Sequence, residues 1–167
     1  MYGVGVSDWT EKRTAPQRQE PLSNMGLIYR EPLEGNVSLV TLIEYADASA
    51  EVRAVYDDIM RSRGVDWINN FWKALANDPA QLKRIWESVQ QVMAPGALDP
   101  LVKEMVYVAV SATNGCEYCT YSHTAAARKK GMSDAMFMEL MAVVGLANET
   151  NRLSNGLRFP VDPQFRR

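Results

Sequence analysis

The sequence predicts an all-α protein of six or seven helices, because three signals agree along most of its length. From Asp47 onward, apolar residues return every three or four positions, which is the period of an amphipathic helix. Helix caps and stops, such as Asp78 before Pro79 and the later Gly131, punctuate this pattern. No alternation of apolar and polar residues is long enough to require a sheet.

The composition is that of an ordinary globular protein. Of 167 residues, 47% are hydrophobic and 23% are charged, so the chain can bury a core without disulfide staples. The 18 basic and 20 acidic residues give a net charge of −2, which argues against a nucleic-acid-binding protein. No apolar run reaches the roughly 18 residues that span a bilayer, and residues 1–20 lack the pattern of a secretory signal. We therefore expect a cytoplasmic protein with neither a membrane nor a nucleic acid as partner.

Residues 1–44 differ from the remainder of the chain. The stretch 9–24 is rich in Gln, Arg, Glu and Pro and has no helical period. Such a segment cannot bury a core of its own. We expect an extended N-terminal arm over residues 1–44, packed on its own domain or on a neighbouring subunit, and a helical domain over residues 45–167. The apolar run 39–45 fits either a strand or the start of a helix.

Three amphipathic helices are predicted before residue 95. The first follows Asp47 and ends at Gly64. The second, around residues 68–75, repeats the same apolar face. The third begins at the Asp78 cap and ends before Pro95. Their apolar stripes are Val52, Val55, Tyr56, Ile59 and Met60; Ile68, Phe71, Trp72 and Leu75; and Leu82, Ile85, Trp86, Val89 and Met93.

Three more helices are predicted in the second half of the chain. The first follows the Asp99-Pro100 cap signal, runs from Leu101 to about Thr113 and is apolar nearly all round, so we expect it to be central and buried. Gly115 separates it from a helix over 116–130, which Gly131 ends. Ser133 caps a sixth helix, whose pattern fades through residues 148–155. Residues 159–167 contain two prolines and are expected to be extended.

Both cysteines and the only histidine fall within one short stretch. Cys116, Cys119 and His123 occupy positions i, i+3 and i+7, which lie on one face of a helix. Cys116 lies near the helix N-terminus, where the partial positive charge favours a thiolate. His123 lies one turn from Cys119 and can exchange a proton with its sulfur. Two thiols at this spacing can close a disulfide after one is oxidised, which favours redox chemistry.

Two other interpretations of this cluster stay open. Cysteine is among the most buried residue types, so the pair could serve packing alone. A zinc ion needs four ligands, or three and a water. The residues that could just supply them are Cys116, Cys119, His123 and Glu104. No second C-x-x-C pair and no second histidine supports such a site, and we expect neither a metal nor a cofactor.

Glu104 is the only acidic residue between Asp99 and Glu117, and it lies in the nearly all-apolar helix. A carboxylate there is costly unless it is paired or used, so it could accept a proton near the thiols. It could equally face solvent with Lys103, since an acid in the second turn favours the helix dipole. The spacing does not decide between these two positions.

The cysteine cluster and its surroundings resemble the AhpD-like alkylhydroperoxidases of the carboxymuconolactone decarboxylase superfamily. The resemblance covers roughly residues 45–150. It includes Glu104, eleven intervening residues and Cys116-x-x-Cys119-x-x-x-His123, followed by Ala126, Lys130 and Gly131. It implies an AhpD-like helical fold that assembles as a homo-oligomer, a trimer or a hexamer.

The resemblance also implies a role for each site residue. In the family, peroxide attacks the second cysteine of the motif, so Cys119 would be peroxidatic and Cys116 would resolve it. Glu104 and His123 would relay protons. The helix dipole favours Cys116 as the thiol of lower pKa, whereas the adjacent histidine favours Cys119. The resemblance decides for Cys119.

The activity implied by the resemblance is that of a thiol peroxidase. A hydroperoxide would be the substrate and a dithiol the reductant, which in the best-known case is a lipoylated protein.

Tyr118 departs from the family pattern, because the best-known members carry a histidine there. A tyrosine, with an ordinary pKa of about 10, is a poorer proton shuttle. The decarboxylase branch lacks the cysteine pair, so lactone decarboxylation is disfavoured. The competing interpretation is a non-catalytic redox sensor or interaction protein with a reversible disulfide.

Overall fold

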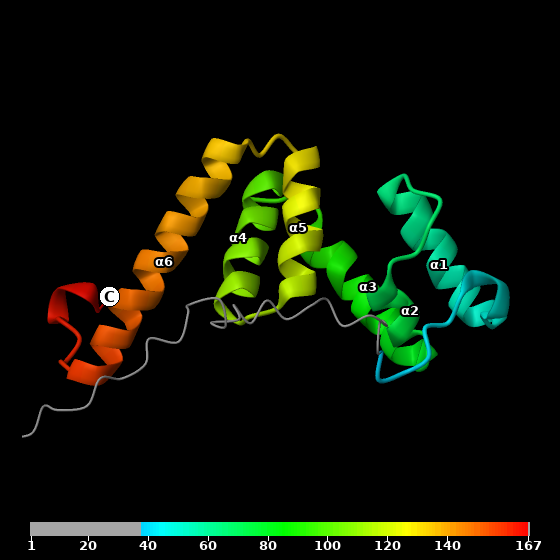
Figure 1. Ribbon diagram of the computed structural model, residues 1–167, viewed down its shortest axis with the longest axis horizontal. Helices are drawn as coiled ribbons and strands as arrows, with labels where there is room; N and C mark the ends of the chain where they lie inside the picture. The colour runs from blue at the N-terminus through cyan, green and yellow to red at the C-terminus, as the bar shows by residue number, and fades with distance from the viewer. Residues whose placement is uncertain (1–37, 167) are drawn as a thin grey trace, which may run out of the picture. The chain divides into compact units, whose positions relative to one another are not determined.

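The computed structural model describes residues 38–166, which form six α-helices and two short 3-10 helices (Figure 1). The α-helices are α1 (Ala50–Arg63), α2 (Asn70–Leu75), α3 (Pro79–Met93), α4 (Pro100–Thr113), α5 (Glu117–Lys129) and α6 (Asp134–Leu157). The 3-10 helices are η2 (Tyr45–Asp47) and η3 (Pro163–Phe165). No strand occurs within residues 38–166, so the predicted all-α class is confirmed.

The predicted N-terminal arm falls mostly outside the described residues. Its packing on its own domain or on a neighbouring subunit therefore stays a prediction. The elements named above belong to one compact unit, Val40–Arg167. Residues 39–44 form neither of the two predicted elements: they are irregular backbone that leads into η2 at Tyr45. The run is fixed by backbone contacts, because the Ile43 N–H donates to the Lys73 carbonyl at 3.1 Å.

Helices α1, α2 and α3 surround the hydrophobic core, and α3 packs against both of the others. Asp78 caps α3 as predicted, and Gly64 ends α1 in the left-handed region at φ 63°. Helix α2 is shorter than predicted, because it begins after its Asn69 cap. At the centre, the rings of Trp72 and Trp86 meet edge to face with centroids 5.5 Å apart. The core residues are Ala48, Val52, Val55, Tyr56, Ile59, Ile68, Trp72, Ala76, Leu82 and Trp86.

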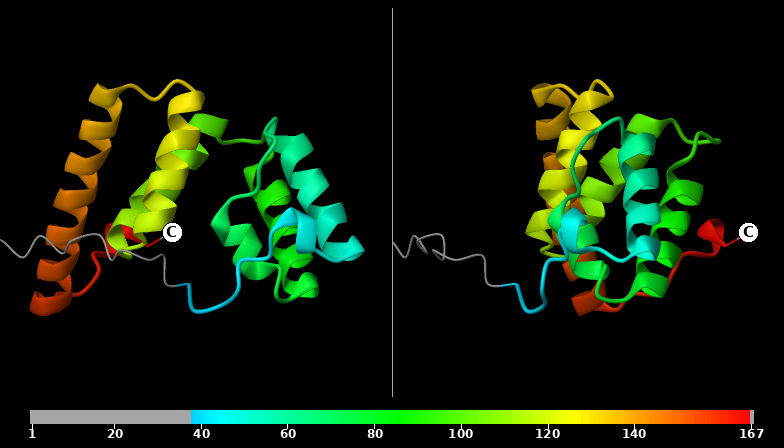
Figure 2. Two further views of the ribbon diagram at one scale, coloured as in Figure 1. Left: turned by 45° about the vertical axis from the view of Figure 1, so that its right-hand side comes forward. Right: turned by 90° about the vertical axis from the view of Figure 1, so that its right-hand side faces the viewer.

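Helices α4 and α5 lie side by side and are joined by a short loop (Figure 2). Gly115 in this loop has a φ of 70°, which confirms its predicted role at the end of α4. The Cys116 N–H then donates to the Ser111 carbonyl at 2.9 Å. Helix α4 buries one stripe, Glu104, Val108 and Ser111, at the i, i+4, i+7 spacing of a single helix face.

The prediction that α4 is buried all round is wrong for the described chain. Val106, for example, is 52% exposed, and Val102 and Val110 are also exposed. The apolar sequence of α4 calls for a cover on more than one face. Within residues 38–166, α5 and α6 are the helices that pack against it, and they leave these valines open.

Helix α6 runs on to Leu157, so the predicted fading of the helix through residues 148–155 is wrong. Two of its polar residues bond back to the helix: the Asn148 amide donates to the Val144 carbonyl, and the Thr150 hydroxyl donates to the Leu146 carbonyl. Ser133 caps α6 as predicted. None of its 24 residues is buried. No helix in the described part of the chain, α6 included, has both the length and the apolar character needed to cross a membrane.

Candidate active site

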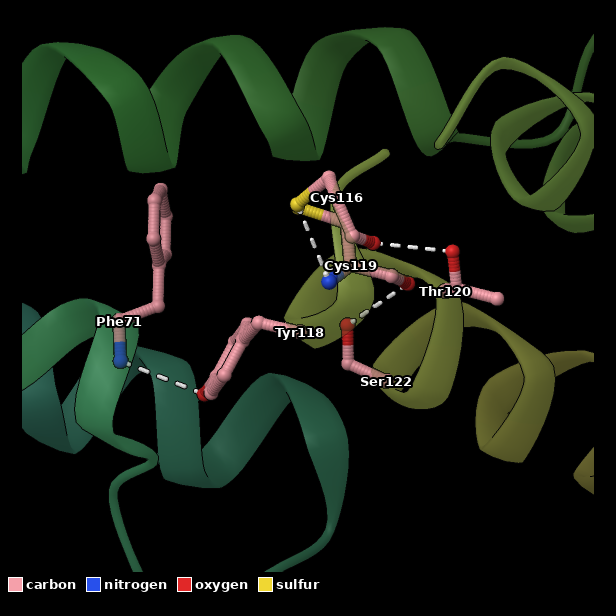
Figure 3. Close-up of a disulfide and its surroundings, with 6 residues drawn as sticks. All are labelled: Phe71, Cys116, Tyr118, Cys119, Thr120 and Ser122. Atoms are coloured by element: carbon pink, nitrogen blue, oxygen red, sulfur yellow. Dashed lines mark hydrogen bonds between the residues drawn. A yellow bond between two sulfur atoms is a disulfide. The ribbon is translucent and has the colours of Figure 1, made fainter. Parts of the chain in front are cut away.

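The two cysteines are joined by a disulfide at the N-terminal end of α5, with Cα atoms 5.4 Å apart (Figure 3). Cys116 is the N-cap residue, and its Sγ accepts the Cys119 N–H at 3.3 Å. The Thr120 hydroxyl donates to the Cys116 carbonyl at 2.9 Å, and the Ser122 hydroxyl to the Cys119 carbonyl at 3.2 Å. The first turn of one helix therefore brings the sulfurs together, as the C-x-x-C spacing predicts.

Glu104 holds His123 across the contact between α4 and α5. The His123 Nδ1 lies 2.7 Å from Glu104 Oε2, and Glu104 is only 6% exposed. Of the two predicted positions for Glu104, the one near the thiols is found and the solvent-facing one is wrong. Lys103 lies elsewhere, with its Nζ donating to the Val92 carbonyl at 2.7 Å. Because Nδ1 faces the carboxylate, Nε2 is the imidazole nitrogen that can exchange a proton with a thiol.

Lys130 completes the surroundings of the Glu104 carboxylate. Its Nζ lies 3.2 Å from Glu104 Oε1, so each carboxylate oxygen faces one nitrogen donor. Burial raises the pKa of Glu104, but the hydrogen bonds from His123 and Lys130 outweigh it, and the net pKa lies below the ordinary value. The carboxylate is therefore ionised at neutral pH. The family motif includes Lys130, and its place two turns after His123 is the signal that could have linked it to the site.

Tyr107 is a site residue that the sequence reasoning missed. Its ring stacks on the His123 imidazole, with centroids 3.6 Å apart and planes 15° apart. Tyr107 follows Glu104 by three positions, which places both on the same side of α4. The i, i+3 spacing of Glu104 and Tyr107 is the feature of the sequence that could have identified Tyr107 as a site residue. The stack and the Glu104 contact together fix the plane of the imidazole.

Tyr118, which stands where the best-known members carry a histidine, points toward α2 and away from the disulfide (Figure 3). Its hydroxyl accepts the Phe71 N–H at 3.3 Å. The structure thus gives Tyr118 a contact between α5 and α2. Its position in the sequence did not indicate this contact, because it joins residues 47 positions apart.

A cavity of about 680 Å³ opens beside these residues. Cys119, His123 and Glu104 line it, together with Tyr107 and Lys130. Of the two cysteines, Cys119 is the one on its wall. The remaining lining comes from α1, α2, α3 and the segment between α1 and α2, and it is mostly apolar; it includes Ile59, Val65, Trp67, Phe71, Trp72 and Trp86. A smaller cavity of about 330 Å³ between α1 and α3 has no cysteine or histidine on its wall.

The zinc interpretation requires Cys116, Cys119, His123 and Glu104 to converge on one point. Within residues 38–166, no three side chains of the types His, Cys, Asp and Glu are grouped so that they could hold a metal ion. Both cysteine sulfurs are instead bonded to each other. The arrangement is that of a disulfide and a hydrogen-bonded His123–Glu104 pair on the same helix, α5, and its neighbour α4.

Comparison with known proteins gives concordant matches. Residues 79–162 match the carboxymuconolactone decarboxylase family. The crystal structure of the alkylhydroperoxidase AhpD core from Rhodospirillum rubrum is 53% identical and superposes with a TM-score of 0.75, covering 77% of this chain and 97% of that one. Alkyl hydroperoxide reductase AhpD from Solibacter usitatus is 34% identical over 85 residues, which are 51% of this chain and 43% of that protein. The chain thus matches less than half the length of this curated relative. The predicted AhpD-like fold is confirmed.

Proposed function

The chain belongs to the carboxymuconolactone decarboxylase family, and from this premise we propose that it is an AhpD-like alkylhydroperoxidase that reduces hydroperoxides at the expense of a dithiol. One observation carries the proposal: the Cys116–Cys119 disulfide lies beside a cavity that the His123–Glu104 pair also lines. Thiol peroxidase chemistry needs a nucleophilic thiol, a proton acceptor, a second thiol and room for the substrate. The site offers all four.

In the proposed cycle, the reduced enzyme reacts first at Cys119. His123 takes the thiol proton through Nε2, while Glu104 stabilises the resulting imidazolium through Nδ1–H. The Cys119 thiolate attacks one oxygen of the hydroperoxide. The S–O bond forms, the O–O bond breaks, and the alkoxide leaves as an alcohol after taking the proton from His123. Cys119 is then a sulfenic acid.

Cys116 resolves this intermediate. Its sulfur attacks the Cys119 sulfur, the disulfide forms, and water leaves with the thiol proton. A dithiol reduces the disulfide by two exchange steps and becomes a disulfide itself. Over one cycle, a hydroperoxide and a dithiol give an alcohol, water and an oxidised dithiol. A lipoyl group carried on a protein would supply such a dithiol. The cytoplasmic location that the sequence favours stays a prediction.

Two observations support Cys119 rather than Cys116 as the peroxidatic residue. Cys119 is the cysteine on the cavity wall, and it lies one helical turn before His123. The N-cap position of Cys116 favours its ionisation instead. A low pKa suits a resolving thiol as well, because the resolving step also needs a thiolate. Access to the substrate distinguishes the two residues.

We also propose that the chain acts as a homo-oligomer, a trimer or a hexamer. The exposed apolar residues of α4 and α6 support this, because solvated monomers rarely leave such extended apolar faces open. They include Val102, Val106, Val110, Val143, Leu146 and Leu153. Light scattering is expected to give an assembly mass of three or six times the chain mass of 18.7 kDa. Val106→Asp is expected to lower this assembly mass, because it places a charge on the exposed apolar face. A monomer at micromolar concentration would contradict the proposal.

A turnover experiment separates the proposed enzyme from a redox sensor. The purified protein is mixed with excess tert-butyl hydroperoxide and excess dihydrolipoamide, and the alcohol and the oxidised dithiol are both counted. We expect many equivalents of each per chain, in a ratio of one to one. A single equivalent per chain, with no further reaction, would identify a sensor and contradict the enzyme proposal. Omitting the protein gives the uncatalysed rate.

A further inference from the structure

Arg63 lies on the wall of the same cavity, and neither the proposed cycle nor the family motif uses it. It is the last residue of α1, and its Cζ lies 5.4 Å from the ring centroid of Trp72 and 5.4 Å from that of Trp86. Cation–π contact of this kind holds a guanidinium in place without neutralising it. Among residues 38–166, Arg63 forms no salt bridge.

The charges on the cavity wall favour an anionic ligand. The wall carries three cationic side chains, Arg63, Lys129 and Lys130, and its one acidic residue among those described is Glu104. That carboxylate is already engaged by Lys130 and His123. Arg63 keeps an exposed surface, and partial desolvation of its guanidinium lowers its pKa. An anion entering the cavity would compensate this charge.

The remainder of the wall favours a ligand with an apolar body. Besides Tyr107 and Tyr118, four aromatic residues line the cavity together with aliphatic side chains: Trp67, Phe71, Trp72 and Trp86. The volume of about 680 Å³ is within the range of pockets that enclose organic molecules. Hydrogen peroxide, which is nearly as small as water, would leave most of this apolar surface uncovered.

We propose that Arg63 binds the carboxylate of the substrate, and that the site therefore prefers hydroperoxides of carboxylic acids with an apolar chain, such as fatty-acid hydroperoxides. This inference rests on the proposed function and names its substrate class. The planar guanidinium pairs with both oxygens of a carboxylate. The chain lies against the aromatic wall, in the cavity that also holds Cys119. Arg63 is a specificity-determining residue and takes no part in bond making.

The first test compares one hydroperoxide with and without its charge. Linoleic acid hydroperoxide and its methyl ester are each reduced with dihydrolipoamide, a neutral dithiol, so that only the hydroperoxide carries a carboxylate. We expect kcat/KM to be about tenfold higher for the acid, through KM, because a charge-assisted bond is gained. Arg63→Met keeps an apolar stem over the tryptophans. It is expected to remove this preference and to leave kcat/KM for the ester within about twofold of the wild-type value.

Matched variants separate recognition from folding. Arg63→Lys keeps the charge without the planar fork, and is expected to retain part of the preference. Arg84→Met removes an exposed arginine of α3 that is not on the cavity wall, and is expected to change nothing. Equal kcat/KM for acid and ester in the wild type would overturn the proposal. So would equal losses for both in Arg63→Met, because Arg63 would then be a structural residue.

A second test measures recognition without turnover. Decanoate and decanol are titrated into the oxidised protein, and binding is followed by tryptophan fluorescence, since three tryptophans line the cavity. We expect decanoate to bind about tenfold more tightly than decanol, and Arg63→Met to remove the difference. Equal binding in the wild type would overturn the proposal. If binding depends on Arg63 while no hydroperoxide is turned over, carboxylate recognition is supported and the peroxidase function itself fails.

Discussion

Cys119→Ser is expected to abolish hydroperoxide-dependent oxidation of the dithiol, leaving only the uncatalysed rate. A serine hydroxyl is not ionised at neutral pH and cannot form a sulfenic acid, so the first bond to oxygen is never made. The initial rate is expected to fall by at least about 10³-fold, because the substitution removes the nucleophile itself. The measurement is the initial rate under multiple turnover with dihydrolipoamide and tert-butyl hydroperoxide.

Cys116→Ser provides the matched control, because it keeps the proposed nucleophile and removes the second thiol. It is expected to consume one equivalent of hydroperoxide and then stop, with Cys119 trapped as a sulfenic acid. Dimedone labelling and mass spectrometry would locate that sulfenic acid. If Cys116→Ser turns over like the wild type, Cys116 is not the resolving residue. If the labelled sulfenic acid instead forms on Cys116 in Cys119→Ser, the roles are reversed and the N-cap position decides reactivity.

The second large effect is expected at the proton-transfer pair. His123→Gln is expected to lower kcat/KM by about 10²–10³-fold near neutral pH, because the Cys119 proton loses its acceptor. Glu104→Gln is expected to cost less, about tenfold, since it leaves the imidazole in place without the opposite charge. Raising the pH above the ordinary thiol pKa of about 8.5 is expected to recover part of both losses, because the thiol then ionises without help.

Tyr121→Phe is the control for this pair, since Tyr121 lies on the same helix and is 73% exposed. It is expected to leave the rate unchanged. If kcat/KM of His123→Gln stays as far below the wild-type value at high pH as at neutral pH, the role of His123 as a base is contradicted. Such a result would indicate that the imidazole acts only by holding the site together, for example through its stack on Tyr107.

The lowered pKa of Glu104 adds a dependence of stability on pH. The folded pKa lies below the ordinary value of 4.5, so the ionised carboxylate stabilises the folded state at any pH above that value. This contribution is lost as the pH falls from 4.5 through the folded pKa. Urea unfolding is expected to show that the difference between wild type and Glu104→Gln narrows in this acid range. A constant difference would mean that the carboxylate charge does not contribute.

Local geometry explains why much of the fold could be predicted. The caps at Asp78 and Ser133 and the end of α1 at Gly64 each depend on a few adjacent residues. The helix whose C-terminal end was misjudged is α6. There, Asn148 and Thr150 bond back to carbonyls one turn earlier, so polar residues that are typical of a helix end continue the helix.

By itself the sequence determined the helices, the disulfide spacing and the face shared by Cys119 and His123, because all of these follow from the period of a single helix. Only the tertiary structure decided where Glu104 lies, since a residue in an apolar helix can turn toward a neighbour or toward solvent. It also decided that Arg63, from α1, shares a cavity with Cys119, from α5. Contacts between residues of different helices depend on how those helices pack, and the periodicity along one helix does not encode them.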